Sequence, residues 1–216
     1  MSDAGLAAGL RVLGLPDDAE LCQRLLAYRD ELARWNQVHN LSGVKDPERM
    51  VAVHLLDSLA LAPLVRGERL ADVGSGGGLP GMPLALLRPD LEVVLIEPRA
   101  KRALFLDHVV RTLGAGNVIV ERSRAEDVPA GGGFDTLTAR AFGTLAEFVT
   151  TAGRLARAGG VLLAAKGRDP WAEAEELPAG WSAEILPLVV PGIDAERHAV
   201  RLFRTRGGER ESWAGS

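Results

Sequence analysis

The sequence predicts an α/β domain with a mostly parallel sheet, a helical N-terminal extension and an antiparallel pair of strands at the C-terminal end. Three observations predict this fold. Apolar residues recur at helical spacing in the first third; from residue 69 short apolar runs alternate with amphipathic stretches; and the last two apolar runs have no helix between them. With 216 residues, 47% of them hydrophobic, the chain suits one domain of above-average size and is short for two.

Residues 1–66 form the predicted helical extension, which packs on a core domain of residues 67–216 to give one compact unit. A helix is expected over Asp17–Gln37, with Asp17 as its N-cap and Glu20 three residues on. Its apolar face comprises Leu21, Leu25, Tyr28, Leu32 and Trp35. A shorter helix is expected over Leu6–Leu13. Asp46-Pro47 opens a further helix that runs toward Leu61.

The core follows a strand–helix alternation, which is typical of βαβ units and a parallel sheet. Strands are expected at Leu70–Val73, Val93–Ile96, Val118–Val120, Thr136–Ala139 and Val161–Ala165. Helices are expected at Met82–Leu87, Lys101–Leu113 and Leu145–Leu155. Ala183–Val189 and Ala199–Phe203 form the antiparallel pair that closes the sheet, and the polar tail after Thr205 is expected to be loose.

Composition limits the class of protein. The net charge of −4 counts against a protein that coats nucleic acid generally, although a local basic patch is compatible with it. A single cysteine, Cys22, excludes a disulfide scaffold and fits a reducing compartment. Neither a signal peptide nor a membrane span is recognisable, so we expect a cytoplasmic protein that acts away from membranes.

The most informative segment is the glycine loop of residues 72–81, Asp-Val-Gly-Ser-Gly-Gly-Gly-Leu-Pro-Gly, which follows a strand and opens a helix. No P-loop lysine follows the glycines, whereas Gly76, Gly78 and Gly81 have the dinucleotide-binding spacing. Pro80 and Pro83 lack the N–H groups that hold a pyrophosphate at a helix N-terminus. The carboxylate of Asp72 would repel phosphate but suits the ammonium and sulfonium of S-adenosylmethionine (SAM).

A second acid supports a nucleoside ligand. Glu97 ends the next predicted strand, where a carboxylate can accept hydrogen bonds from two ribose hydroxyls. NAD would satisfy Glu97 as well as SAM does, so Glu97 does not choose between these cofactors.

At this point the chain resembles a known family. The glycine loop looks like motif I of class I SAM-dependent methyltransferases, and its Leu-Pro-Gly ending resembles the GidB (RsmG) family of bacterial 16S rRNA guanine-N7 methyltransferases. Other stretches match that family in order over roughly residues 21–204: residues 35–36 with 39–41, 54–58, 101–102 with 105–106, 123–126, 140–142, 166–167 and 196–198. The ordered series is far more specific than motif I alone.

The resemblance implies a seven-stranded class I methyltransferase sheet and SAM as cofactor. The implied substrate is a guanine in the conserved decoding-region loop of 16S rRNA. Implied and predicted SAM contacts together comprise Asp72, Gly74, Gly76, Gly78, Leu79, Glu97, Ala125, Glu126 and Arg140. Arg140 is also the expected catalytic residue, through positioning, with no general base. The sequence is compatible with naked rRNA, an assembly intermediate or the mature small subunit as substrate. We expect a monomer and no DNA partner.

The residues restrict which atom could be methylated. Cytosine C5 requires a cysteine nucleophile, and Cys22 lies in the N-terminal extension, where we expect a buried structural thiol. The Asn/Asp-Pro-Pro-aromatic motif of exocyclic amine methylation is absent at residues 138–142. Guanine N7 carries a lone pair and no proton, so its methylation needs positioning alone.

The four histidines lack metal-ligand spacing, and no metal is expected. His54 and Asp57 are three residues apart on one predicted helix, where a local hydrogen bond is expected. Basic residues near the carboxyl ends of the strands predict an RNA surface: Lys101, Arg102, Arg124, Lys166 and Arg197, with a net +4 over residues 197–210. Phe142 could stack on the target base or pack in the core.

Two alternatives stay open at this stage. One is a small-molecule methyltransferase on the same fold, which would leave RNA and ribosomal subunits unmethylated. The other is a nucleotide-binding regulator without catalysis, which a turnover assay would separate from an enzyme.

Overall fold

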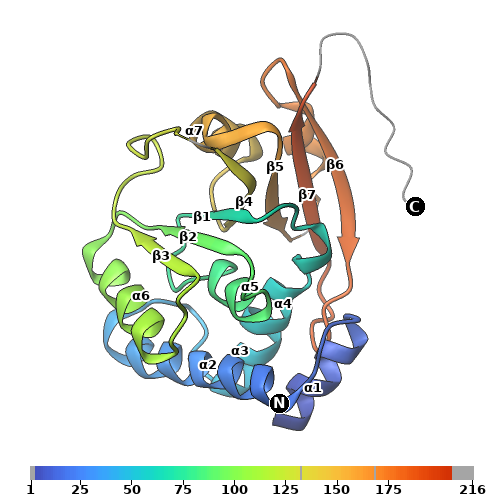
Figure 1. The fold of residues 1–216 in the computed structure, drawn as a ribbon. Coiled ribbons are helices and arrows are strands. Elements are labelled where there is room, and N and C mark those ends of the chain that lie inside the picture. Colours follow the sequence, from blue (N-terminus) through green and yellow to red (C-terminus); the bar gives the residue numbers. More distant parts are fainter. Residues whose placement is uncertain (1–2, 132, 168, 206–216) are drawn as a thin grey trace.

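The computed structural model describes residues 3–131, 133–167 and 169–205, and it contains a seven-stranded sheet in the order β3-β2-β1-β4-β5-β7-β6 (Figure 1). The strands are β1 (Arg69–Val73), β2 (Glu92–Ile96), β3 (Val118–Glu121), β4 (Phe134–Arg140), β5 (Ala156–Lys166), β6 (Trp181–Leu188) and β7 (Arg197–Arg204). Strands β1 to β5 pair in parallel, whereas β7 is antiparallel to both β5 and β6. The predicted fold class is confirmed; the predicted loose tail lies outside the described residues after Thr205.

Helices follow β1, β2 and β4 as expected, whereas the described residues between β3 and β4 contain no helix. The α-helices are α1 (Asp3–Val12), α2 (Ala19–His39), α3 (Pro47–Met50), α4 (Asp57–Leu59), α5 (Gly81–Leu87), α6 (Ala100–Thr112), α7 (Leu145–Ala152) and α8 (Trp171–Glu175). Two short 3-10 turns, η2 (Ala62–Leu64) and η3 (Gly153–Leu155), precede β1 and β5. No helix within the described residues is long and apolar enough to span a membrane.

Alternate residues of the strands supply two separate layers of core, because successive side chains on a strand point to opposite faces. Leu70 and Leu95 pack with the side chains of α1, α2, α5 and α6. Ala71 and Ile96 face the other way and pack with those of α7 and its neighbours. The N-terminal helices therefore share a core layer with α5 and α6, below the sheet as Figure 1 shows it.

The helix expected after Asp46 is interrupted. Pro47–Met50 is α-helical with Asp46 as its N-cap, but Val51–Leu56 forms a π-helix, η1, before α4 resumes. The Asp57 amide donates to the Ala52 carbonyl five residues earlier, which is the wide turn of a π-helix. Such segments are frequent at functional sites, and η1 lies next to the one described below.

One capping prediction was wrong. Asp18, and not Asp17, is the N-cap of α2, and its carboxylate accepts from the Leu21 amide at 3.0 Å. The helix starts one residue later than expected, so Asp17 is left to pair with Arg11 at 2.7 Å.

Candidate functional site

Parallel pairing gathers the ends of four strands at the carboxyl edge of the sheet. Val73 pairs with Ile96, Ile96 with Glu121, and Asp72 with Thr138. The residues that follow these strands therefore lie side by side. The predicted cofactor residues, taken from four separate stretches of sequence, come from this one edge.

Asp72 at the end of β1 is fully buried. Its Oδ2 accepts from the Gly81 amide at 2.9 Å, and Thr138 Oγ1 lies 3.4 Å from Oδ1. Burial raises the pKa of Asp72 to about 6, against the hydrogen bonds from Gly81 and Ser75 and the charge of Arg140, which lower it. The carboxylate thus occupies the start of α5 itself. A pyrophosphate there would meet a fixed acid and two prolines in place of open N–H groups.

The glycine loop turns back sharply between β1 and α5. Gly74 has φ +70°, a conformation that favours glycine, and a Cβ placed there would meet only the ring of Phe142, at 3.5 Å. At Gly81 there is no space for a side chain, since an added Cβ would lie 2.8 Å from the Asp72 carboxylate. The Gly81 end of the loop is therefore packed against Asp72 of β1, whereas the space beside Gly74 could hold a ligand.

The Tyr28 hydroxyl ties the N-terminal extension to this loop. It lies on α2, is fully buried, and donates to the Gly77 carbonyl at 2.6 Å. Burial raises the pKa of Tyr28 well above its usual value, so the hydroxyl stays protonated and remains a donor.

Glu97 stands at the end of β2 as predicted and is held by main-chain donors. It accepts from the Gly76 amide at 2.9 Å and from the Arg99 amide at 2.8 Å, and Arg102 Nη1 lies 3.9 Å away. Each carboxylate oxygen keeps a second lone pair, so a ribose hydroxyl can still donate to it.

The loop after β3 carries Ala125, which is buried, and Glu126, which is exposed. Arg154, from the turn before β5, holds this loop by donating to the carbonyls of Ala125 and Val128 at 2.8 Å and to that of Glu126. The buried Ser123 hydroxyl has no hydrogen-bond partner among the described residues. An unsatisfied buried hydroxyl beside Ala125 and Glu126, two of the expected SAM contacts, fits a ligand that would supply its hydrogen-bond partner.

Arg140 ends β4 and points toward η1. It donates to the Val53 carbonyl at 2.9 Å, its Nη2 lies 3.3 Å from His54 Nδ1, and its Nη1 lies 3.5 Å from Asp57 Oδ2. The local hydrogen bond expected between His54 and Asp57 is replaced by these contacts with Arg140. His54 Nε2 instead pairs with Ser42 Oγ at 2.7 Å. Burial, and then the charge of Arg140, lower the pKa of His54 to about 4.

The five predicted RNA-binding residues fall into two groups. Arg102 lies near Gly76 and Glu97, Lys101 precedes it on α6, and Arg124 lies on the loop after β3; Lys101 and Arg124 are exposed. Lys166 and Arg197 lie at the adjoining ends of β5 and β7. Both are engaged within the protein: Lys166 pairs with Glu173 at 2.8 Å, and Arg197 Nε donates to Asp57 at 3.1 Å.

The remaining arginines of the C-terminal basic stretch point elsewhere. Arg201 pairs with Glu184, and Arg204 lies 5.0 Å over the Trp181 ring. Arg206 and Arg210 lie outside the described residues. The Phe142 ring packs at 5.4 Å from that of Phe148 and borders Gly74, so it is partly core and partly site.

A cavity of about 430 Å³ adjoins Arg197. It lies between the start of α3 with η1 and the connection from β6 to β7. Its lining carries both signs of charge and includes Asp46, Arg49, Val53, Ile193, Asp194 and Arg197. Since Val53 also bonds Arg140, the cavity borders the same cluster of side chains.

Within the described part of the chain, no group of three or more histidine, cysteine and acidic side chains could hold a metal ion. Cys22 is buried in α2, with its sulfur 3.7 Å from the Asp17 carbonyl, as expected of a structural thiol.

The residues at the carboxyl edge fit SAM. Gly74 offers an open face, Glu97 can accept from ribose hydroxyls, and Ser123 lacks a partner. Three further residues that support the site were not identified from the sequence: Tyr28, Asp57 and Arg154. In the sequence, Tyr28 belongs to an apolar helix face, and the spacing of Asp57 indicates only a local contact with His54. No sequence pattern marked Arg154.

Comparison with known proteins agrees with this geometry. The family description "GidB: rRNA small subunit methyltransferase G" matches residues 21–200. Ribosomal RNA small subunit methyltransferase G from Stenotrophomonas maltophilia is 52% identical over 198 residues, covering 91% of this chain and 92% of that protein. The protein of the same name from Xanthomonas campestris is 49% identical over the same coverage.

Solved structures show the fold. The O-methyltransferase TomG from Streptomyces achromogenes, in complex with SAM, has a TM-score of 0.57 at 19% identity and covers 95% of this chain and all of its own. A SAM-dependent methyltransferase from Aquifex aeolicus has a TM-score of 0.57 at 19% identity, covering 76% of this chain and 96% of its own.

Proposed function

Because the chain belongs to the GidB family of rRNA small subunit methyltransferases, we propose that it methylates N7 of a guanine in 16S rRNA with SAM as methyl donor. The family match over residues 21–200 carries this proposal. A cytoplasmic location follows from a ribosomal substrate.

The glycine loop, Glu97 and the loop of residues 123–126 would hold SAM, with Arg140 at the adjacent strand end. When bound, SAM supplies a methyl carbon on a positively charged sulfur, open to attack by a ring-nitrogen lone pair. Because N7 carries no proton, no residue of the chain has to remove one, which agrees with a site built from arginines, glycines and buried acids.

The side chains of this edge would therefore act by positioning. Arg140 is fixed by the Val53 carbonyl and by Asp57, so its guanidinium has a defined orientation before any substrate arrives. Holding two reactants in the correct geometry can supply an effective concentration of about 10⁵–10⁸ M. A guanidinium there can donate to guanine O6 while leaving N7 open.

Asp72 supports SAM over NAD as the cofactor. It fills the N-terminal turn of α5, where a dinucleotide would need N–H groups for its pyrophosphate. SAM has no phosphate, so its binding does not need free N–H groups at this turn. Calorimetry should therefore find SAM and S-adenosylhomocysteine binding tighter than NAD; tighter binding of NAD would contradict this cofactor assignment.

The function is tested with methyl-labelled SAM and small ribosomal subunits from cells that lack this protein. Label is expected in 16S rRNA, in one guanine whose glycosidic bond becomes labile on borohydride reduction, which is diagnostic of N7 methylation. Label in cytosine or in an exocyclic amine would contradict N7 chemistry. SAM binding without transfer to any RNA would favour the regulator or the small-molecule enzyme.

The matched control is Gly74→Asp, which fills the open face of the loop and should abolish SAM binding and transfer together. Cys22→Ser should retain turnover, because N7 chemistry uses no thiol. A loss greater than about tenfold in a folded Cys22→Ser protein would argue for a cysteine mechanism.

A further inference from the structure

We propose that Asp57 is a positioning residue for methyl transfer: it holds Arg140 and Arg197, which come from different strands, in one fixed arrangement at the carboxyl edge. The proposal rests on the proposed function and deepens it. Asp57 lies on no strand of the sheet, and its role is carried by contacts that the π-helix η1 creates.

The geometry of the carboxylate is the first step. Oδ1 accepts from Arg197 Nε at 3.1 Å, and Oδ2 lies 3.5 Å from Arg140 Nη1. The Asp57 side chain is only 10% exposed, while those of Arg140 and Arg197 are 20% and 28% exposed. A nearly buried acid thus serves two arginines that still reach the surface.

The second step is where the two arginines come from. Arg140 ends β4, and Arg197 begins β7. Since β7 runs antiparallel to β5, its first residues lie beside the last residues of β5, with His198 paired to Lys166. Both arginines therefore stand at the carboxyl edge, on the side of β1 away from β2 and β3.

The third step is the role of η1. Its wide turn places the Val53 carbonyl, His54 and Asp57 against the same guanidinium, that of Arg140. Arg140 is held from several directions, whereas Arg197 bonds Asp57 and the carbonyl of its own neighbour, Glu196. Loss of Asp57 should therefore loosen Arg197 more than Arg140.

The fourth step is charge. One carboxylate between two guanidiniums leaves a net charge of about +1 on this group of three side chains, beside a cavity whose lining carries both signs of charge. An RNA phosphate or a guanine carbonyl oxygen would meet two guanidiniums in a fixed arrangement, so less side-chain entropy is lost on binding. Asp57 is thus predicted to act through the arginines and without touching the substrate.

The test compares Asp57→Asn with Asp135→Asn. Asp135 is a matched control, since it is also a buried acid paired with an arginine, Arg157, but it starts β4 at the opposite edge of the sheet. Each variant is assayed for transfer to small subunits at saturating SAM, for SAM affinity by calorimetry and for thermal unfolding.

For Asp57→Asn we expect kcat/KM for small subunits to fall at least about tenfold, or about 1.4 kcal/mol in the barrier. Its SAM affinity should stay within about threefold. Asp135→Asn should keep kcat/KM within about twofold at a temperature where it is folded. If Asp57→Asn does not fold, Asp57→Glu, which keeps the charge but shifts it, carries the same expectation.

A double-variant cycle separates positioning from a general structural role. If Asp57 acts through Arg197, combining Asp57→Asn with Arg197→Ala should cost less than the product of the two single losses. Normal transfer by Asp57→Asn, multiplicative losses, or equal losses in Asp57→Asn and Asp135→Asn would each overturn the proposal. Absence of transfer by the unaltered protein would instead defeat the proposed function, and this role with it.

Discussion

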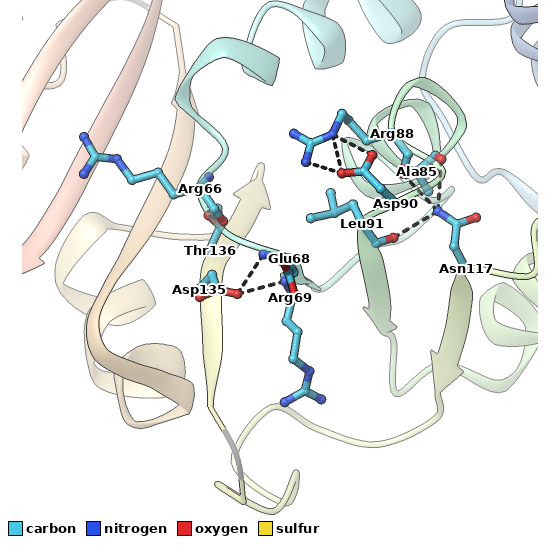
Figure 2. A network of polar contacts seen from close by, with 10 residues as sticks. All are labelled: Arg66, Glu68, Arg69, Ala85, Arg88, Asp90, Leu91, Asn117, Asp135 and Thr136. Carbon is cyan, nitrogen blue, oxygen red and sulfur yellow. Dashed lines mark hydrogen bonds and ion pairs between the residues drawn. The ribbon is translucent and has the colours of Figure 1, made fainter. Parts of the chain in front are cut away.

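Polar side chains bond the main chain at both edges of the parallel sheet, but the carboxyl edge also gathers two arginines around one acid. At the amino edge they bond the main chain: Asp135 accepts from the amides of Glu68 and Arg69 at 2.9 Å, and Asn117 donates to the carbonyls of Ala85 and Leu91 (Figure 2). At the carboxyl edge, Arg140 and Arg197 share the side chain of Asp57 and remain partly exposed.

The difference separates stability from function. At the amino edge, the buried carboxylate of Asp135 is enclosed by two main-chain amides and Arg157, which leaves it no space for a ligand. A guanidinium with five donors that shares one carboxylate keeps several of them for a substrate. Substitutions at the amino edge should therefore act on unfolding, and those at the carboxyl edge on binding and turnover.

The largest expected effect is at the amino edge. Asp135→Ala leaves two amides and Arg157 without their acceptor, so the free energy of unfolding should fall by about 3 kcal/mol. Urea titration measures this loss. Turnover of the folded fraction should be unchanged; a large loss of kcat in folded protein would break the division between the edges.

The next effect is at the carboxyl edge. Arg140→Ala removes the guanidinium held by Val53 and Asp57, and methyl transfer should fall about a hundredfold, or about 2.7 kcal/mol in the barrier. SAM affinity should fall as well, while the unfolding temperature changes little. If Arg140→Ala lost as much stability as Asp135→Ala and still transferred methyl groups normally, the role of Arg140 would be to stabilise the fold.

The dependence of stability on pH should show the lowered pKa of His54. Its pKa is 6.5 in the unfolded chain and about 4 in the folded protein, so acidification from about pH 7 to about pH 4 favours unfolding. At about pH 5 this costs about 2 kcal/mol relative to about pH 8. Urea titrations at both pH values should show that the change on acidification is about 2 kcal/mol less favourable in the native sequence than in His54→Gln.

Asp72 serves as the internal control for this comparison. Its raised pKa, about 6, makes its contribution fall as pH rises from about 4 to about 6, which is the opposite sign. Asp72 is present in both proteins, so their difference isolates His54. An equal loss on acidification in both would place the acid sensitivity elsewhere.

The smallest effect concerns Lys166. If it binds an rRNA phosphate, Lys166→Ala should weaken RNA binding a fewfold and reduce the log–log salt slope by about 0.7–0.9, with SAM affinity unchanged. Lys166 would have to exchange Glu173 for the phosphate, so Glu173→Gln should strengthen RNA binding. An unchanged salt slope in both variants would place the RNA surface elsewhere.

Local pattern was sufficient for the sheet and most helices. Alternating apolar runs located all seven strands, although β5 begins five residues before the expected Val161, because Gly159 and Gly160 interrupt the apolar run. The five-residue helix α8 and the π-helix η1 were not predicted. Both are short, and apolar periodicity does not distinguish such turns.

The site was predictable where it follows strand ends and not where it depends on tertiary contacts. Gly74, Glu97 and Arg140 stand at consecutive strand ends, which the parallel topology places at one edge. Asp57 and Arg197 are 140 residues apart, and Arg154 reaches the loop of residues 125–128 from a different turn. No spacing rule connects such pairs, since only the folded chain brings them together.

The hydrogen bond from Tyr28 to Gly77 couples the local unfolding of two segments of the chain. Because it joins the second helix to the cofactor loop, opening of either segment exposes a polar group that the other had satisfied. Local opening of the two should then be one cooperative event. Amide hydrogens of α2 should exchange with solvent more slowly once the loop is saturated with ligand, although this helix lies outside the part of the chain that carries the glycine motif.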